Sequence, residues 1–142
     1  MTTQTLLMTH IGLTLFMTGV IWYVQLVHYP LFSFVVRSQY ERFQADHEKR
    51  TGFIVVPVML AELVSGIGLL FAPPDDDAGV LLIVNAGLLG LIWFSTFFLQ
   101  VPRHRTLATG FNVKEHNLLV KSNWVRTLGW TIRSVLLMSL IT

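Results

Sequence analysis

Four long apolar stretches dominate this sequence, and each is about as long as a lipid bilayer requires. A transmembrane helix needs roughly 20 consecutive, mostly apolar residues. The stretches cover residues 6–27, 53–72, 79–101 and 118–141. Within hydrocarbon the backbone must satisfy its own hydrogen bonds, so each stretch is predicted to be a helix. The expected fold is all-α, a four-helix transmembrane bundle in a single integral membrane domain that covers residues 1–142.

The composition agrees with a chain embedded in lipid. The sequence is 53% hydrophobic and 13% charged, whereas soluble domains carry about 25% charged residues. It contains no cysteine, which excludes disulfides, thiolate metal sites and covalently attached haem. The net charge of +2 comes without a basic run, so we do not expect a nucleic-acid partner.

The loops predict the direction in which the helices run. Lysine and arginine residues occur in the connections 30–52 and 102–123, but not in the turn 73–77 or at either terminus. By the positive-inside rule both long connections are cytoplasmic, and both termini lie outside. We therefore expect a multi-pass protein of the cell's inner (plasma) membrane.

The connection 30–52 is not expected to be a plain loop. Phe34 and Phe43 give it an apolar side, and Arg42 lies among its polar residues. One interpretation is an amphipathic helix that lies against the lipid headgroups on the cytoplasmic face. The other is a continuation of the first helix past a kink at Pro30.

The two halves of the chain resemble each other weakly, at an offset of 71 residues. Residues 19–22 (GVIW) align with residues 90–93 (GLIW), and Glu62 aligns with Arg133. A true repeat would make the protein two tandem helical hairpins related by an axis along the membrane normal. Chance similarity between apolar segments is the alternative.

Glu62 and Arg133 are predicted to lie deep within the second and fourth helices. A charge inside the bilayer costs at least about 2.5–3.5 kcal/mol, so each needs a partner. We expect Glu62 to pair with Arg133 or with Arg126. Such a pair would either hold two helices in register or belong to a buried polar pocket.

Polar and aromatic side chains recur at helical spacing along the helices, mostly in the halves expected to face the cytoplasm. Stripes this polar should face the bundle interior rather than lipid. They comprise Trp22, Gln25, His28 and Tyr29; Asn85, Trp93, Thr96 and Gln100, followed by His104; and Asn123, Arg126, Trp130 and Arg133. They predict a polar pocket in the cytoplasmic half of the bundle. Helix-to-helix hydrogen bonding and headgroup-belt residues are the alternative.

A pocket of this kind would bind a lipophilic small molecule. Its predicted lining residues are Trp22, Gln25, Tyr29, Glu62, Trp93, Gln100, Arg126, Trp130 and Arg133. His28 and His104 are candidate catalytic residues, because imidazole exchanges a proton near neutral pH. This would allow redox or oxygenase-type chemistry. A non-catalytic structural or assembly subunit of the membrane is the alternative function.

No motif identifies a cofactor. His28, His47 and His104 would supply ligands for a transition metal if they meet at the inner membrane face. His28 with His104 is the one plausible axial pair for haem. Glycines on the apolar helices allow close packing between helices, so association of the chain into a homo-oligomer is a further open alternative.

Four segments carry a resemblance to known proteins. They are residues 25–32 (QLVHYPLF), 46–52 (DHEKRTG), 99–105 (LQVPRHR) and 123–127 (NWVRT), the last followed by Trp130 and Arg133. Together they resemble a group of small, largely uncharacterised bacterial four-helix integral membrane proteins, which is distantly similar to anthrone-oxygenase-like membrane proteins. The resemblance implies a helical membrane fold and transfers no catalytic residues. A fainter likeness to the bacterial haem-binding protoporphyrinogen oxidase rests on His10, Gly19 and Tyr23.

Overall fold

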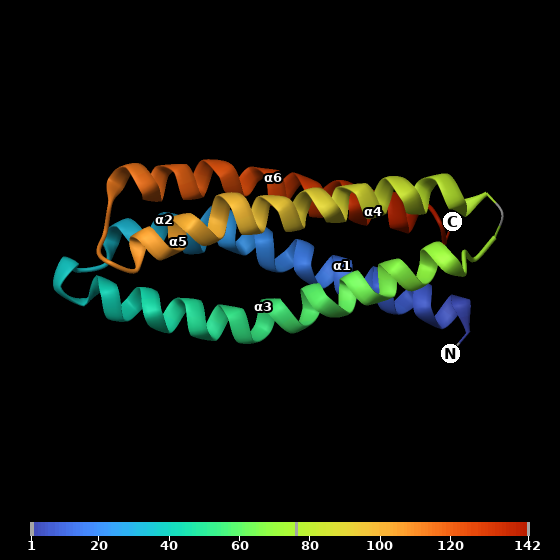
Figure 1. Ribbon diagram of the computed structural model, residues 1–142, viewed down its shortest axis with the longest axis horizontal. Coiled ribbons are helices and arrows are strands. Elements are labelled where there is room, and N and C mark those ends of the chain that lie inside the picture. The colour runs from blue at the N-terminus through green and yellow to red at the C-terminus, as the bar shows by residue number, and fades with distance from the viewer. Residues whose placement is uncertain (1, 76, 142) are drawn as a thin grey trace.

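A computed structural model describes residues 2–75 and 77–141, and the fold in these residues is all-helical, as predicted. Four long helical segments cover residues 3–34, 37–71, 78–107 and 113–138. Figure 1 shows them running alternately in opposite directions. Both termini and the turn after the second segment lie at one end, and the other two connections lie at the opposite end.

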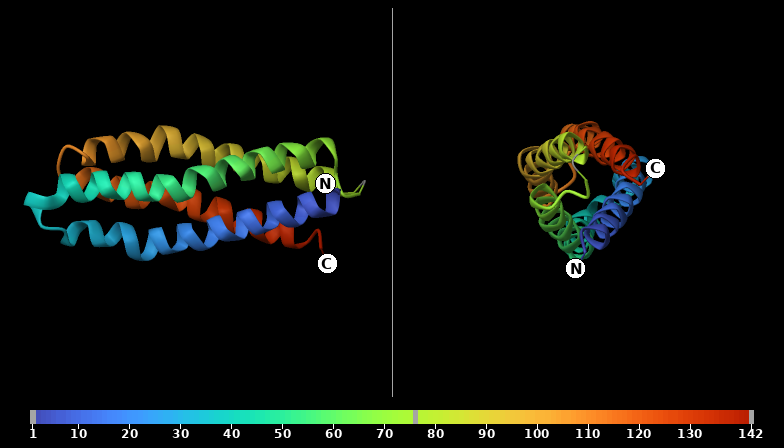
Figure 2. Two further views of the ribbon diagram at one scale, coloured as in Figure 1. Left: turned by 90° about the horizontal axis from the view of Figure 1, so that it is seen from below. Right: turned by 90° about the vertical axis from the view of Figure 1, so that its right-hand side faces the viewer.

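The four segments form a ring around a common axis. Helix α1 (Thr3–Tyr23) packs against α3 (Tyr40–Phe71) and α6 (Val113–Met138), and α4 (Ala78–Ser95) also packs against α3 and α6. Helices α3 and α6 are therefore diagonally opposite each other, as the end-on view in Figure 2 shows. Any side-chain contact between α3 and α6 must cross the centre of the bundle.

The first three segments are long and apolar enough to cross a membrane. Large apolar side chains cover their outer faces; Phe53, Phe71 and Val80 are 84%, 86% and 75% exposed. Apolar surface of this extent is rare on soluble monomers and marks a surface that contacts lipid or another protein. The structure therefore agrees with a membrane-embedded protein.

Helix α6 carries the charges that interrupt the fourth apolar stretch. Arg126 and Arg133 are buried inside the bundle, whereas Leu128, Ile132 and Val135 are exposed on the outer face. From Arg126 onward, the helix thus buries most of its polar side chains and exposes apolar ones. This explains why its composition is less apolar than that of the other three segments.

A π-helical stretch precedes a proline in both the first and the third segment. Stretch η1 (Val24–His28) comes before Pro30, and η4 (Thr96–Gln100) comes before Pro102. In each, the residue before the proline donates its amide hydrogen to the carbonyl five residues earlier. Proline lacks an amide hydrogen and its ring clashes with the carbonyl four residues back, so a wider turn relieves the clash.

The first segment continues past Pro30. Short helices α2 (Tyr29–Leu31) and η2 (Phe32–Phe34) complete it, η3 (Arg37–Gln39) opens the second segment, and α5 (Val101–Leu107) completes the third. Residues 40–52 belong to α3 instead of forming a separate helix, and Tyr40, Gln44 and His47 are buried on its inner side. The continuation past Pro30 therefore holds only as far as Phe34, and neither interpretation of residues 30–52 predicted that residues 40–52 extend the second long helix.

Gly129 allows a close approach of α6 to α4. A Cβ atom at this position would lie 2.9 Å from Ile92 Cγ1, which is nearer than real Cβ contacts allow. Gly129→Ala should therefore lower the free energy of unfolding by about 1–3 kcal/mol, measured by thermal unfolding in detergent. Gly90→Ala is the matched control, because a Cβ atom there meets nothing within 4 Å. Equal loss of stability in both variants would contradict this packing.

Candidate functional site

An apolar cavity of about 500 Å³ lies under α3, between this helix and the first and third segments. Sites for small molecules usually have volumes of roughly 300–1,000 Å³. The wall is mainly apolar and includes Val20, Ile21, Val24, Val55 and Met59. The predicted site residues on this wall are Tyr29, His47, Trp93, His104 and Arg126.

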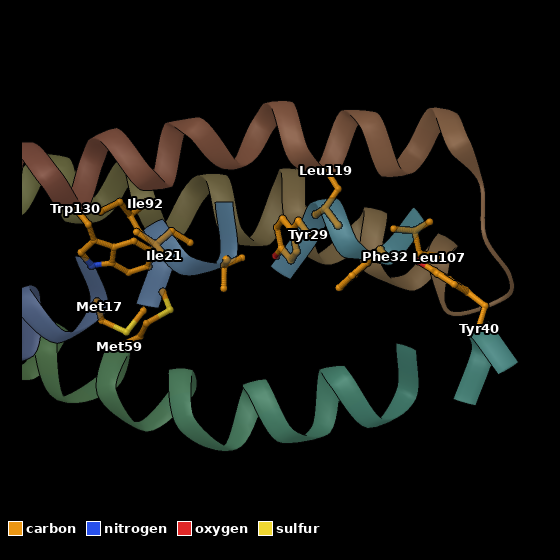
Figure 3. Packing of buried hydrophobic residues seen from close by; sticks show 11 residues of the cluster. Met17, Ile21, Tyr29, Phe32, Tyr40, Met59, Ile92, Leu107, Leu119 and Trp130 are labelled. Atoms are coloured by element: carbon orange, nitrogen blue, oxygen red, sulfur yellow. The ribbon is translucent and has the colours of Figure 1, made fainter. Parts of the chain in front are cut away.

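The cavity exists because the first half of α3 contributes few side chains to the core. In the main cluster of buried apolar residues, α3 supplies only Tyr40 and Met59. Figure 3 shows these two side chains far apart along α3. Facing the cavity between them are Thr51, Gly52 and Val55, which are small or short. Figure 1 also shows α3 bending near its middle, and the helix contains Pro57.

Three histidines gather at the end of the bundle opposite the termini, as predicted. The ring of His47 lies 4.7 Å from that of His28 and 5.4 Å from that of His104. His28 Nε2 and His47 Nδ1 are 2.8 Å apart and share a hydrogen bond. In the described residues, however, no group of three or more His, Cys, Asp or Glu side chains is placed to hold a metal ion.

His104 forms a directed hydrogen-bond chain with Gln44 and Tyr29. The carboxylate of Glu48 can only accept a hydrogen bond, so it fixes Gln44 Nε2 as the donor at 3.1 Å. The same nitrogen lies 2.8 Å from His104 Nδ1, which therefore accepts. The ring proton then sits on Nε2 and is donated to Tyr29 Oη at 2.9 Å. The phenol hydrogen of Tyr29 is left to be donated elsewhere, and Tyr29 lines the cavity.

Two further donors on the cavity wall are buried and have no hydrogen-bond partner: Arg126 Nε and Trp93 Nε1. Arg126 is 8% exposed, and its guanidinium lies 5.6 Å from the Trp130 ring centroid. The ion pair found in the described residues joins Arg133 to Glu62, so the charge of Arg126 has no carboxylate partner there. A buried donor without a partner costs about 1–3 kcal/mol, and a charged group costs more.

The ion pair between Glu62 and Arg133 lies deeper in the bundle, and both side chains are fully buried. It confirms the predicted pairing of Glu62. Because Glu62 is on α3 and Arg133 is on α6, the pair crosses the bundle axis. Thr14 Oγ1 donates a hydrogen bond of 2.7 Å to the Glu62 carboxylate, and Trp130 Nε1 donates one of 3.1 Å.

The other two nitrogens of Arg133 also have hydrogen-bond partners. Its Nε donates to Asn85 Oδ1 at 3.0 Å, and its Nη2 lies 3.2 Å from His10 Nε2. Arginine can only donate, so His10 carries its proton on Nδ1, which lies 2.8 Å from Ser65 Oγ. The network therefore joins α1, α3, α4 and α6. Glu62 and Arg133 connect these helices and do not line the cavity under α3, contrary to the prediction that they belong to the ligand pocket.

The network also repeats between the two halves of the chain. Thr14 and Asn85 are separated by the same 71 residues as Glu62 and Arg133. Thr14 bonds to Glu62, and Asn85 bonds to Arg133. Equivalent positions of the two hairpins therefore make equivalent contacts, which favours the hypothesis of a duplicated hairpin over chance similarity.

Several predicted lining residues lie outside the cavity. Trp22, Gln25 and Gln100 each donate a side-chain hydrogen bond to α6, at 3.0, 3.1 and 3.3 Å. They connect helices, as the alternative interpretation of the polar stripes holds. The residues of the deep network lie off the cavity wall too, namely Glu62, Trp130 and Arg133. His28 lines a second cavity of about 490 Å³, which lies between α3 and the first segment.

Sequence reasoning does not single out Thr14, Gln44, Thr51 and Ser65. Hydroxyl side chains are common in membrane helices, where they bond to their own backbone or to neighbours, so they carry little signal. The 71-residue offset is the one sequence feature that finds Thr14, because it relates this residue to Asn85. His10 is indicated only by the faint likeness to a haem-binding oxidase.

Comparison with protein-family models, with curated proteins and with solved structures found no match to this chain. The resemblance to anthrone-oxygenase-like membrane proteins therefore stays a prediction. Function must be argued from the geometry of the cavity and of the buried network.

Glu62→Gln should lower the free energy of unfolding by about 3–5 kcal/mol, because it leaves the charge of Arg133 buried without a counter-ion. The double variant Glu62→Gln/Arg133→Gln removes both charges and should recover at least half of this loss. Thermal unfolding in detergent gives the coupling between the two positions. Glu41→Gln, at an exposed carboxylate, is the control and should change stability little. Strictly additive effects at Glu62 and Arg133 would contradict the pairing.

Proposed function

We propose that the chain crosses a plasma or bacterial inner membrane four times, with α6 as the fourth crossing helix. The apolar outer face of α6 supports this, since its arginines point inward. Both termini and the acidic turn share one end of the bundle, as Figure 1 shows, and the basic connections share the other. The positive-inside rule then assigns the histidine-rich end to the cytoplasm.

We propose that the protein binds a lipophilic small molecule in the cavity under α3. The observation that carries this proposal is the pairing of an apolar wall with buried donors that lack partners, on Arg126 and Trp93. A core that served packing alone would close the space, because protein interiors are close-packed. It would also pair the donors, as nearly all buried polar groups are paired.

The cavity opens between helices, toward the surface where lipid would lie. Val56 and Leu60 on α3 and Phe97 on η4 belong to its wall and are 51%, 47% and 56% exposed. An apolar rim of this kind admits a molecule dissolved in the bilayer more readily than one dissolved in water. The proposed ligand therefore enters sideways, past α3.

The hydrogen-bonded pair of His104 and Tyr29 supports an enzymatic form of the same function. Both residues line the cavity, and the 2.9 Å contact between His104 Nε2 and Tyr29 Oη would let His104 replace a proton that Tyr29 gives to a bound molecule. Of the two candidate catalytic histidines, His104 faces this cavity and His28 does not. A redox or oxygenase-type reaction on the lipophile is the proposed activity, with His104 as the proton-transfer group.

Filling the cavity should remove the ligand without unfolding the protein. Val55 lines both cavities beside α3, so Val55→Trp should reduce the co-purifying lipophile about tenfold, measured by mass spectrometry of a solvent extract. Val80→Trp is the matched control, because this residue is 75% exposed on the outer face. A wild-type protein that carries no more lipophile than the Val55→Trp variant would favour the alternative, a non-catalytic structural subunit.

A further inference from the structure

We infer that the ligand of the cavity is an anionic amphiphile whose acidic head group is held by Arg126, Trp93 and Tyr29. The inference rests on the proposed function and names the chemical class of the molecule. The head would be a carboxylate or a phosphate, and the tail would be a hydrocarbon chain along α3.

The free polar groups on the cavity wall are hydrogen-bond donors. Arg126 Nε and Trp93 Nε1 can only donate, and both are buried on the wall without a partner. The phenol hydrogen of Tyr29 is a third free donor, because its oxygen accepts from His104. The buried atoms without a partner on this wall are thus donors. A ligand that completes the site must bring acceptor oxygens, and an alcohol or amine would complete it poorly.

The positive charge of Arg126 also favours an anionic ligand. Arg126 is nine-tenths buried on the cavity wall, and the described residues place no carboxylate against it. Seven residues further along the same helix, Arg133 is also buried but is paired with Glu62. A buried charge without a counter-ion is strongly unfavourable. An acidic ligand would give Arg126 the counter-ion that Glu62 gives Arg133, and charge-assisted hydrogen bonds of this kind are the strong ones.

Much of the remaining cavity wall is apolar. Away from Arg126, the cavity is lined by Val20, Val24 and Val55, and these side chains also line the second cavity. The two cavities are therefore neighbouring spaces under α3. A hydrocarbon tail fits along this apolar surface, while the free donors fix the position of the head. The charged residues Glu48 and Arg105 also line the cavity but are exposed at its rim.

The test compares two probes with the same chain and different heads, hexadecanoate and hexadecan-1-ol. Binding to the full-length protein in detergent is measured by native mass spectrometry, at a pH at which the acid is ionised. Wild-type protein should bind hexadecanoate at least about tenfold more tightly than hexadecan-1-ol. Arg126→Met should abolish this preference and retain binding of hexadecan-1-ol. Arg105→Met, which removes a charge at the exposed rim, should keep the preference.

Tyr29→Phe keeps the shape of the side chain, Trp93→Phe keeps an aromatic ring, and each removes one donor. Each variant should reduce the preference for hexadecanoate over hexadecan-1-ol several-fold. These two variants therefore test the proposal if Arg126→Met does not fold. Equal wild-type affinity for both probes would overturn the anionic ligand and leave the proposed lipophile site standing. Binding of neither probe would contradict the proposed function itself. A tighter complex with hexadecyl phosphate than with hexadecanoate would identify a lipid phosphate as the head group, and the reverse order a carboxylate.

Discussion

The whole arrangement depends on how a chain that is largely surrounded by lipid satisfies its buried charges. Arg126 and Arg133 lie two turns apart on α6, and both are buried in the bundle. Arg133 meets a carboxylate, an amide and an imidazole from the three other helices. That network fixes the register of all four helices about the bundle axis. Arg126 has no such set of partners, and it faces a cavity instead.

The two arginines also differ in the residues that stand 71 positions before them. At the 71-residue offset, the counterpart of Arg133 is Glu62, whereas the counterpart of Arg126 is Val55. Positions 62 and 133 thus form an ion pair, whereas positions 55 and 126 place a valine and an arginine on the wall of the cavity. At the depth of Glu62 and Arg133, hydrogen-bonded side chains fill the centre of the bundle and hold the helices together. Where α3 bends away from the other helices, the same bundle has room for a ligand.

Much of the fold could be predicted from the sequence, because lipid imposes simple rules on length, polarity and loop charge. The depth of Glu62 alone was enough to require a cationic partner, and Arg133 is that partner. The site was harder to predict, because helical spacing places a residue on a face and not at a depth in three dimensions. Trp22, Gln25 and Gln100 share faces with cavity residues, yet they bond to α6. The cavity itself depends on residues that α3 lacks, and periodicity gives no signal for missing side chains.

The most direct test of the account is an experimental density map of the full chain, purified from the membrane in which it is made. The account predicts elongated density under α3, with one end in contact with Arg126 and Trp93 and the rest along Val55. A cavity closed by inward movement of α3, with the guanidinium of Arg126 paired to a carboxylate of the chain, would contradict it.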